Sequence, residues 1–195
     1  GNDYIRCLNP VPLGNSSRTV SFWVKTDSTS ISQLNNIVFS YGSNETVSFQ
    51  QFRVTLAGSC SQSISAVSFG ANRDIPYVPS GDWEMVSVVF DSNVAANCAG
   101  IKLYLNSIEL QNYCYDFAGS AINTSGLHPI TLGCYHDLNW TTDRGFYKGL
   151  LDDVMVYNRA LSPSEIQQLY IAQSFAWSTN ETAPTITVSP TTNTT

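Results

Sequence analysis

The stretch from residue 149 to residue 170, GLLDDVMVYNRALSPSEIQQLY, constrains the fold more than any other part of the chain. Its first nine residues form a run of strand length, rich in the β-branched and aromatic side chains that suit a pleated sheet. The second half changes to a short helix, because Ser162 and Glu165 form a capping box around Pro163 at the first helical position. An apolar stripe at i, i+3 and i+4 from Ile166 predicts that this helix lies on the body of a β domain.

The same stretch resembles the closing signature of laminin-G-like domains in the concanavalin A-like lectin/glucanase superfamily, G-[IL]-[IL]-D-[DE]-V-x-[IV]-Y-x-R-x-L-S-x-x-E-I. Other strand motifs of that family are matched, in family order, by residues 3–7, 20–26, 81–91, 100–110 and 130–133. The resemblance implies an all-β fold, a two-sheet antiparallel jelly-roll sandwich with one short C-terminal helix and an extended C-terminal tail. Further strand-like runs fit this fold at residues 36–41, 49–56 and 64–69. The matched motif at 20–26 makes Trp23 a core residue.

The composition limits the class of partner. Only 12% of the 195 residues are charged, and the formal net charge is −6. Nucleic acid recognition needs a basic face, so we expect no nucleic acid partner. No apolar run reaches the length of about 20 residues that a membrane-spanning helix needs, so we expect no membrane span. Because the chain begins at Gly1 without an initiator methionine, we interpret it as a processed chain or a fragment.

Six N-x-[S/T] sequons indicate a secreted or cell-surface glycoprotein. They begin at Asn15, Asn44, Asn123, Asn139, Asn180 and Asn193. Sequons of this kind accept N-linked glycans on the surface of secreted proteins. Five cysteines in a chain with few charges also fit an oxidising compartment. The predicted location is therefore extracellular, and the predicted covalent groups are N-glycans.

The C-terminal end differs in composition from the rest. Residues 1–175 are assigned to the sandwich domain, and residues 176–195 to a threonine- and proline-rich tail or linker that carries two of the sequons. The same composition suits O-glycosylation. Residues 184–189 (PTITVS) alternate as a short strand does, so this segment is a candidate for donation to an exposed sheet edge of a neighbouring subunit.

The odd number of cysteines leaves at least one thiol free or paired outside the chain. Cys98 and Cys114 flank a hairpin centred on Asn106-Ser107, and a two-residue turn brings them nearly opposite each other, so we predict a disulfide between them. The other three cysteines leave every pairing open, with the third as a candidate link between chains: Cys7, Cys60 and Cys134. Zinc ligation is disfavoured, because no C-x-x-C spacing is present.

Catalytic carboxylates are not evident. Glycan-cleaving enzymes of this superfamily use an E-x-D-x-x-E run on one strand, and a retaining enzyme needs two carboxyl groups about 5–5.5 Å apart. The sequence has no such run. The adjacent pair Asp152-Asp153 points to opposite faces of a strand, so we interpret it as structural, accepting hydrogen bonds from nearby backbone or from Arg159. We expect no catalytic residues and no enzyme activity.

The loop at residues 134–145 offers two sets of candidate ligand contacts. The first set consists of rings that can stack on a sugar: Tyr135, His136 and Trp140. The second consists of carboxylates for Ca²⁺, which many laminin-G-like domains bind at the sandwich rim: Asp137 and Asp143. Alternatively, the two acids are ordinary loop residues exposed to solvent. A glycan on Asn139 would shield this surface.

Two functions of different classes remain open. The first is a non-catalytic structural or adhesive subunit of an extracellular surface or fibrous assembly, with self-association or neighbouring extracellular proteins as partners. The second is a lectin-like module that binds glycans or proteins through rim loops, with Ca²⁺ as an optional cofactor. The threonine-rich tail and the odd cysteine favour the first by a small margin.

Overall fold

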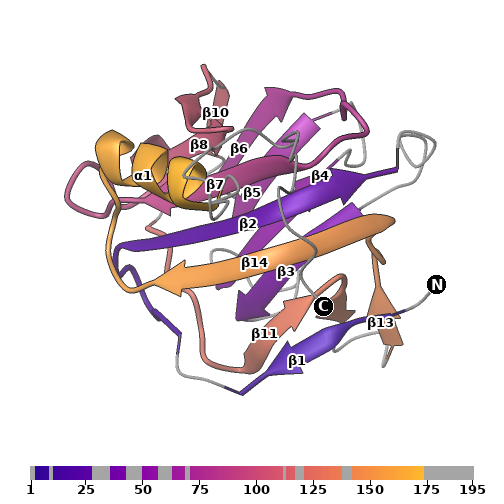
Figure 1. Cartoon of the computed structure of the whole chain (residues 1–195). Coiled ribbons are helices and arrows are strands. Elements are labelled where there is room, and N and C mark those ends of the chain that lie inside the picture. The colour runs from indigo at the N-terminus through magenta and orange to yellow at the C-terminus, as the bar shows by residue number, and fades with distance from the viewer. Residues whose placement is uncertain are drawn as a thin grey trace, which may run out of the picture.

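The computed structural model is an all-β sandwich with one α-helix (Figure 1). It describes residues 3–8, 11–27, 36–42, 50–56, 63–68, 71–111, 113–116, 121–137 and 142–173. Two antiparallel sheets form the two layers, so the predicted jelly-roll sandwich with a short helix near the C-terminus is confirmed. Within these ranges, no helix is long and apolar enough to cross a membrane.

The seven strands of the larger sheet are, in spatial order, β1 (Ile5–Cys7), β11 (His128–Leu132), β3 (Asn36–Gly42), β4 (Gln51–Leu56), β5 (Ser63–Ser68), β6 (Ala71–Pro76) and β10 (Tyr113–Asp116). The five strands of the smaller sheet are β14 (Gly149–Tyr157), β2 (Arg18–Thr26), β7 (Glu84–Phe90), β8 (Ile101–Leu105) and β9 (Ile108–Glu109). A separate hairpin pairs β12 (Tyr135–Asp137) with β13 (Thr142–Arg144). Among the strands that the structure describes, β1 and β14 are therefore edge strands, and each has one edge that pairs with no other described strand.

The main core lies between the two sheets. Val20, Phe22 and Val24 of β2 alternate with outward-facing residues and are fully buried against the facing sheet. Phe52 and Phe39 of the larger sheet meet edge to face, with ring centroids 6.5 Å apart. Burying one such side chain contributes about 1.5–3 kcal/mol relative to leaving it exposed, so the alternation fixes the register of both sheets.

A second apolar cluster covers the outer face of the smaller sheet. The helix α1 (Pro163–Gln173) lies across this face, and its Ile166 packs on Met85 and Tyr104. The rings of Trp23 and Tyr170 stack, with centroids 5.6 Å apart and planes 18° apart. Trp23 therefore packs, but beneath the helix rather than between the sheets, because it alternates with the inward-facing residues of β2.

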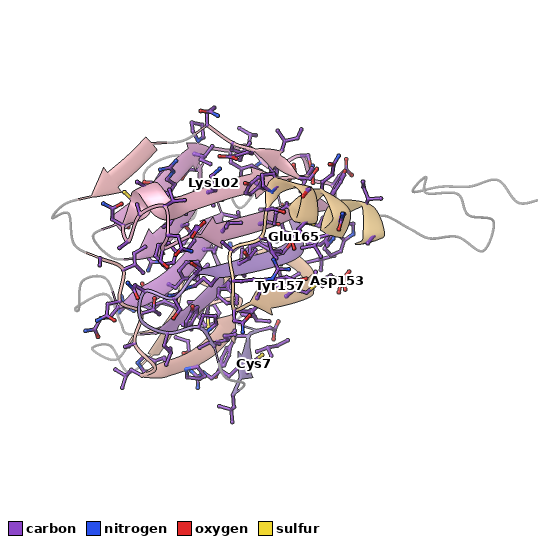
Figure 2. All side chains as sticks on the ribbon, turned by 90° about the vertical axis from the view of Figure 1, so that its left-hand side faces the viewer. Cys7, Lys102, Asp153, Tyr157 and Glu165 are labelled. Carbon is purple, nitrogen blue, oxygen red and sulfur yellow. The ribbon has the colours of Figure 1, made fainter. Side chains whose placement is uncertain are left out.

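The helix begins with the predicted capping box. The backbone N–H of Ser162 donates to Oε2 of Glu165 (2.8 Å), and the backbone N–H of Glu165 donates to Oγ of Ser162 (3.3 Å). Arg159 forms a 2.7 Å salt bridge with Glu165. Glu165 lies at the start of the helix (Figure 2). Of the two partners expected for Asp152-Asp153, only the backbone one is found, since the N–H of Asp153 donates to Asp152 Oδ1 (2.8 Å).

The predicted hairpin turn at Asn106-Ser107 is confirmed. Both residues have positive φ, 48° and 67°, as a type I′ turn requires. The hairpin is shorter than predicted, however, because β9 has two residues and the chain then crosses to the larger sheet as β10. Cys98 and Cys114 therefore do not lie opposite each other across one hairpin, and that part of the prediction is wrong.

A buried arginine closes one end of the sandwich at the start of β2. Arg18 is fully buried, and its guanidinium donates five hydrogen bonds of 2.6–3.0 Å. The acceptors are the carbonyl oxygens of Pro12, Gly14 and Ser16 and the hydroxyls of Tyr41 and Thr124. Because these acceptors come from three separate segments, Arg18 holds the loops at this end together.

Candidate functional site

The opposite end of β2 borders a groove between the open edges of β1 and β14, which we call the edge groove. Its floor is the segment from Gly145 to Gly149, which crosses from one sheet to the other. The carbonyl of Gly145 accepts from the N–H of Ile37 (2.8 Å) in the larger sheet. Gly149 pairs with Thr26 in the smaller sheet. The groove thus exists because this connecting segment crosses from the larger sheet to the smaller one.

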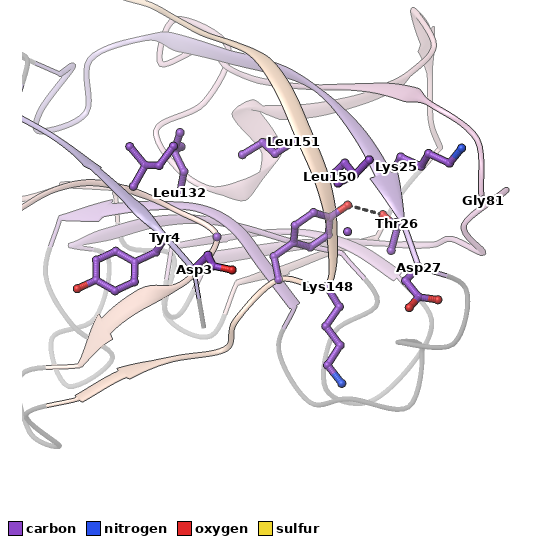
Figure 3. A pocket seen from close by; sticks show the side chains of 14 residues that line it. Asp3, Tyr4, Lys25, Thr26, Asp27, Gly81, Leu132, Lys148, Leu150 and Leu151 are labelled. Atoms are coloured by element: carbon purple, nitrogen blue, oxygen red, sulfur yellow. Dashed lines mark hydrogen bonds between the residues drawn. The ribbon is translucent and has the colours of Figure 1, made fainter. Parts of the chain in front are cut away.

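Tyr147 anchors this floor. Its backbone N–H donates to Gly133 (2.8 Å), and its hydroxyl is hydrogen-bonded to the hydroxyl of Thr26 (2.8 Å; Figure 3). Burial raises the pKa of Tyr147 to about 12, so the phenol stays protonated at neutral pH. A Cβ on Gly149 would lie 2.5 Å from the Tyr147 hydroxyl and 2.5 Å from the Lys25 carbonyl. Only glycine leaves room for the ring at this position.

The edge groove has a volume of about 810 Å³ and an amphipathic lining. Figure 3 shows Tyr4 at one side of it and Lys25 with Gly81 at the other. Tyr4 is 42% exposed, and the guanidinium of Arg6 lies 4.9 Å from the centroid of its ring. A concavity of several hundred Å³ with apolar walls and a few polar groups is the usual form of a ligand site.

The charged side chains of the groove are mixed in sign. Lys25 and Lys148 stand on its rim together with Asp3 and Asp27, and all four are exposed. Within the described part of the chain, neither lysine forms an ion pair or a side-chain hydrogen bond. By contrast, Lys102 pairs with Glu109 (3.1 Å) on the far side of the molecule. A groove with both donors and acceptors suits a ligand rich in hydroxyl groups.

The outer face of the larger sheet is polar but closed. Its side chains Ser40, Arg53, Thr55 and Ser65 are all buried. The ring of Tyr135 in β12 lies over Arg53, 5.3 Å from the guanidinium carbon. The cavity beside Ser40 and Tyr135 measures about 10 Å³, room for one water molecule and not for a sugar. We therefore take the edge groove as the candidate site.

The residues predicted as ligand contacts do not line this groove. Tyr135 is buried against Arg53, and Asp143 accepts a 2.6 Å salt bridge from Arg6. The side chains of His136 and Asp137, together with Trp140, lie outside the described residues. Among the side chains that are described, no three of His, Cys, Asp or Glu are grouped so as to hold a metal ion. Calcium binding therefore stays a prediction.

The cysteines divide into two kinds. Cys98 is disulfide-bonded, and its carbonyl accepts a 3.2 Å hydrogen bond from Arg73, the register partner of Cys114. The side chain of Cys114 and the whole of Cys60 lie outside the described residues, so the Cys98–Cys114 pairing stays a prediction. Cys7 and Cys134 are free thiols, and burial raises the pKa of Cys134 to about 12.

Two of the predicted glycosylation sites lie together, far from the groove. Asn15 and Asn123 are both exposed, and they flank the bridge at which Gly14 and Thr124 exchange backbone hydrogen bonds of 2.8 and 3.0 Å. This bridge belongs to the closed end held by Arg18. The other sequons lie outside the described residues, at Asn44, Asn139, Asn180 and Asn193. Glycan occupancy stays a prediction at all six.

Comparisons with known proteins agree with this architecture. The family model described as concanavalin A-like lectin/glucanases superfamily matches residues 1–167. No curated protein sequence matches the chain. Among solved structures, a heptameric SAP-like pentraxin from Limulus polyphemus is similar with a TM-score of 0.60 and 16% identity, over 87% of this chain and 76% of that one.

Two further structures come from sialidases. The CBM40 of the IT-sialidase from Ruminococcus gnavus, bound to α2,3-sialyllactose, has a TM-score of 0.56 and 17% identity, over 80% of this chain and 83% of that one. The NanB sialidase from Streptococcus pneumoniae has a TM-score of 0.61 and 19% identity, over 86% of this chain but only 26% of that one. At these identities the likeness establishes the fold alone.

Proposed function

The chain belongs to the concanavalin A-like lectin/glucanase superfamily, and from this premise we propose that it is a non-catalytic, extracellular binding module whose edge groove takes a glycan. The proposal rests on the edge groove, because the groove combines an exposed aromatic ring with positively and negatively charged side chains that can form hydrogen bonds. An aromatic face packs on the C–H face of a sugar, and lysine and aspartate side chains bond its hydroxyls. The glycan-bound CBM40 of similar fold supports this choice of ligand class.

The arrangement of carboxylates supports binding rather than hydrolysis. Asp3 and Asp27 lie exposed on opposite walls of the groove (Figure 3). A glycosidase instead needs two carboxyl groups that face one bond, with the acid held in a pocket that excludes water. The pair Asp152-Asp153 is also exposed, on the β14 bulge.

Glycan binding is tested first on an array, with and without Ca²⁺, and then by titration of the bound glycans with variants. Tyr4→Ala removes the stacking ring, and because such contacts contribute about 0.5–1.5 kcal/mol, we expect affinity to fall about three- to tenfold. The matched control is Ile108→Ala, which removes an exposed apolar side chain from β9, outside the groove. An array with no bound glycan, or equal affinity in Tyr4→Ala, would falsify the proposal.

The open edge of β1 favours a second candidate function, a structural or adhesive subunit. This strand has three residues, exposes Ile5 beside Leu8, and carries the free thiol of Cys7 (Figure 2). Exposed edges of this kind template pairing with another chain, and residues 184–189 are the segment we propose as donor. Light scattering of the native glycoprotein tests this function. Large particles that dissociate without residues 176–195, or with reductant, support it, whereas a monomer contradicts it.

A further inference from the structure

The helix α1 covers only part of the outer face of the smaller sheet. Ile166 and Leu161 cover the part around Met85, and the ring of Tyr170 ends this cover at Trp23. Two residues further along β2, Lys25 is exposed. The same face therefore continues beyond the helix as open surface, and it does so at the end that borders the edge groove.

Strands β14 and β2 and the residue before β7 each contribute one exposed side chain to this open surface. Leu150 of β14 is the register partner of Lys25, so the two share a face. Val24 pairs with Glu84, which places Trp83, the residue before Glu84, beside Lys25 on the same face. Leu150 is 59% exposed and Trp83 is 40% exposed. We call these three residues the face row.

The face row is continuous with the edge groove. Lys25 and Leu150 line both, and Gly81, two residues before Trp83, stands on the groove wall opposite Tyr4 (Figure 3). A ligand that leaves the groove past Gly81 therefore meets the face row. Two exposed aromatic rings, Tyr4 and Trp83, mark the ends of this path.

Single exposed apolar residues are normal on a protein surface. The face row, however, places leucine and tryptophan on either side of a lysine that forms no ion pair or side-chain hydrogen bond with any described residue. The aliphatic stem of Lys25 extends the apolar strip, while its ammonium group remains available to a hydroxyl or an acidic group. A flat apolar strip with one hydrogen-bond donor suits a sugar ring better than it suits solvent.

Resting on the proposed function, we propose that Trp83, Lys25 and Leu150 form a second ligand subsite, and that the module recognises an extended glycan chain that runs from Tyr4 to Trp83. A terminal mono- or disaccharide would fill only the groove and leave Trp83 untouched. The ligand is therefore the interior of a linear oligosaccharide or polysaccharide. Its affinity grows with chain length until both rings are covered.

The test is a length series. Oligosaccharides of two to six sugars from the malto-, cello-, chito- and poly-N-acetyllactosamine series are titrated into the intact glycoprotein. In the series that binds, we expect affinity to rise at least about tenfold between the disaccharide and the hexasaccharide. Trp83→Ala should abolish this rise while leaving disaccharide affinity within about twofold. Tyr4→Ala should weaken every length.

Two controls separate the subsite from a folding defect. Trp83→Phe keeps a ring and should keep most of the length dependence, and Val78→Ala removes an exposed apolar side chain from the same loop without touching the face row. Unfolding midpoints in urea establish that the variants fold. Affinity that is independent of length, or an equal loss at all lengths in Trp83→Ala, overturns this inference alone if Tyr4→Ala still weakens binding. Absence of binding at every length overturns the proposed function as well.

Discussion

Both ends of strand β2 carry a cationic side chain, but Arg18 at one end is buried and Lys25 at the other is exposed. At its first residue, Arg18 brings a cation into the core, and all three of its guanidinium nitrogen atoms donate hydrogen bonds to oxygen atoms of this chain. At its last residues, Lys25 and the nearby Lys148 leave their ammonium groups at the surface of a groove. One end is therefore closed by internal hydrogen bonds, and the other leaves its ammonium groups exposed, as the proposed glycan site requires.

Arg18 is a structural charge, whereas the lysines of the groove are the charges that the proposed glycan site uses. Arg18 has no acidic partner among the described residues, yet it is tolerated at zero exposure because it also lies over the rings of Phe52 and Phe90, 5.5 and 5.4 Å from their centroids. The lysines of the groove contribute little to the fold, because exposed charges of this kind are screened by water. Substitutions at the two ends should therefore act on different observables.

The largest expected effect is on stability, at the closed end. Arg18→Met keeps the apolar stem but removes five hydrogen bonds, and the carbonyl of Ser16 loses its side-chain donor, so we expect a loss of about 3–5 kcal/mol in the free energy of unfolding. Urea denaturation measures it. Lys102→Met, at an exposed salt bridge, is the control and should cost less than about 1 kcal/mol. Similar losses of unfolding free energy in Arg18→Met and Lys102→Met would show that the buried arginine contributes no more to stability than an exposed charge does.

An intermediate effect is expected at the floor of the groove. In Gly149→Ala the new methyl group would overlap the Tyr147 ring and the Lys25 carbonyl, so we expect a loss of about 1–3 kcal/mol together with weaker glycan binding. Gly126→Ala is the matched control, because its methyl group meets only the flexible end of Leu13, at 3.2 Å. If Gly149→Ala bound glycans as well as the natural chain does, the floor would not shape the site.

The smallest effect is expected in the helix that borders the face row. Hydrogen bonds from Arg159, and then from the backbone of Ser162, lower the pKa of Glu165 to about 2 from 4.5. Because the folded pKa is depressed, the carboxylate stabilises α1 fully above pH 4.5, and this contribution is lost as pH falls towards 2. Thermal unfolding of Glu165→Gln and of the natural chain should therefore differ at pH 6 and converge near pH 2. A difference in unfolding temperature that stays constant between pH 6 and pH 2 would show that the Glu165 carboxylate does not stabilise the helix in this way.

The sequence predicted the parts of the fold in which local chemistry and packing agree. The stretch at residues 149–170 defined a strand, a capped helix and their order, because capping needs only neighbours in sequence. The turn at Asn106-Ser107 was predicted for the same reason. The short, polar β6 and the two-stranded β12–β13 sheet were not predicted, because their pairing depends on distant strands rather than on an alternating pattern.

The candidate site was predicted less well than the fold. The sequence directed attention to residues 134–145, where rings and acids cluster, whereas Tyr135 packs inward and Asp143 pairs with Arg6. A side chain's neighbours in sequence do not reveal whether a distant strand covers it. Lys148 stands one residue before the recognised motif, and Tyr4 lies within a matched strand, so neither carried a signal of its own.

Sequence by itself determined the sandwich, through strand motifs that resemble those of a known superfamily, and the helix with its cap, through capping chemistry. Tertiary structure alone decided where the molecule is open. The edge groove exists because the chain crosses between the sheets at Gly145–Gly149, which brings the unpaired edges of β1 and β14 to one side. Residues about 140 positions apart in the chain meet there, and no local pattern encodes that meeting.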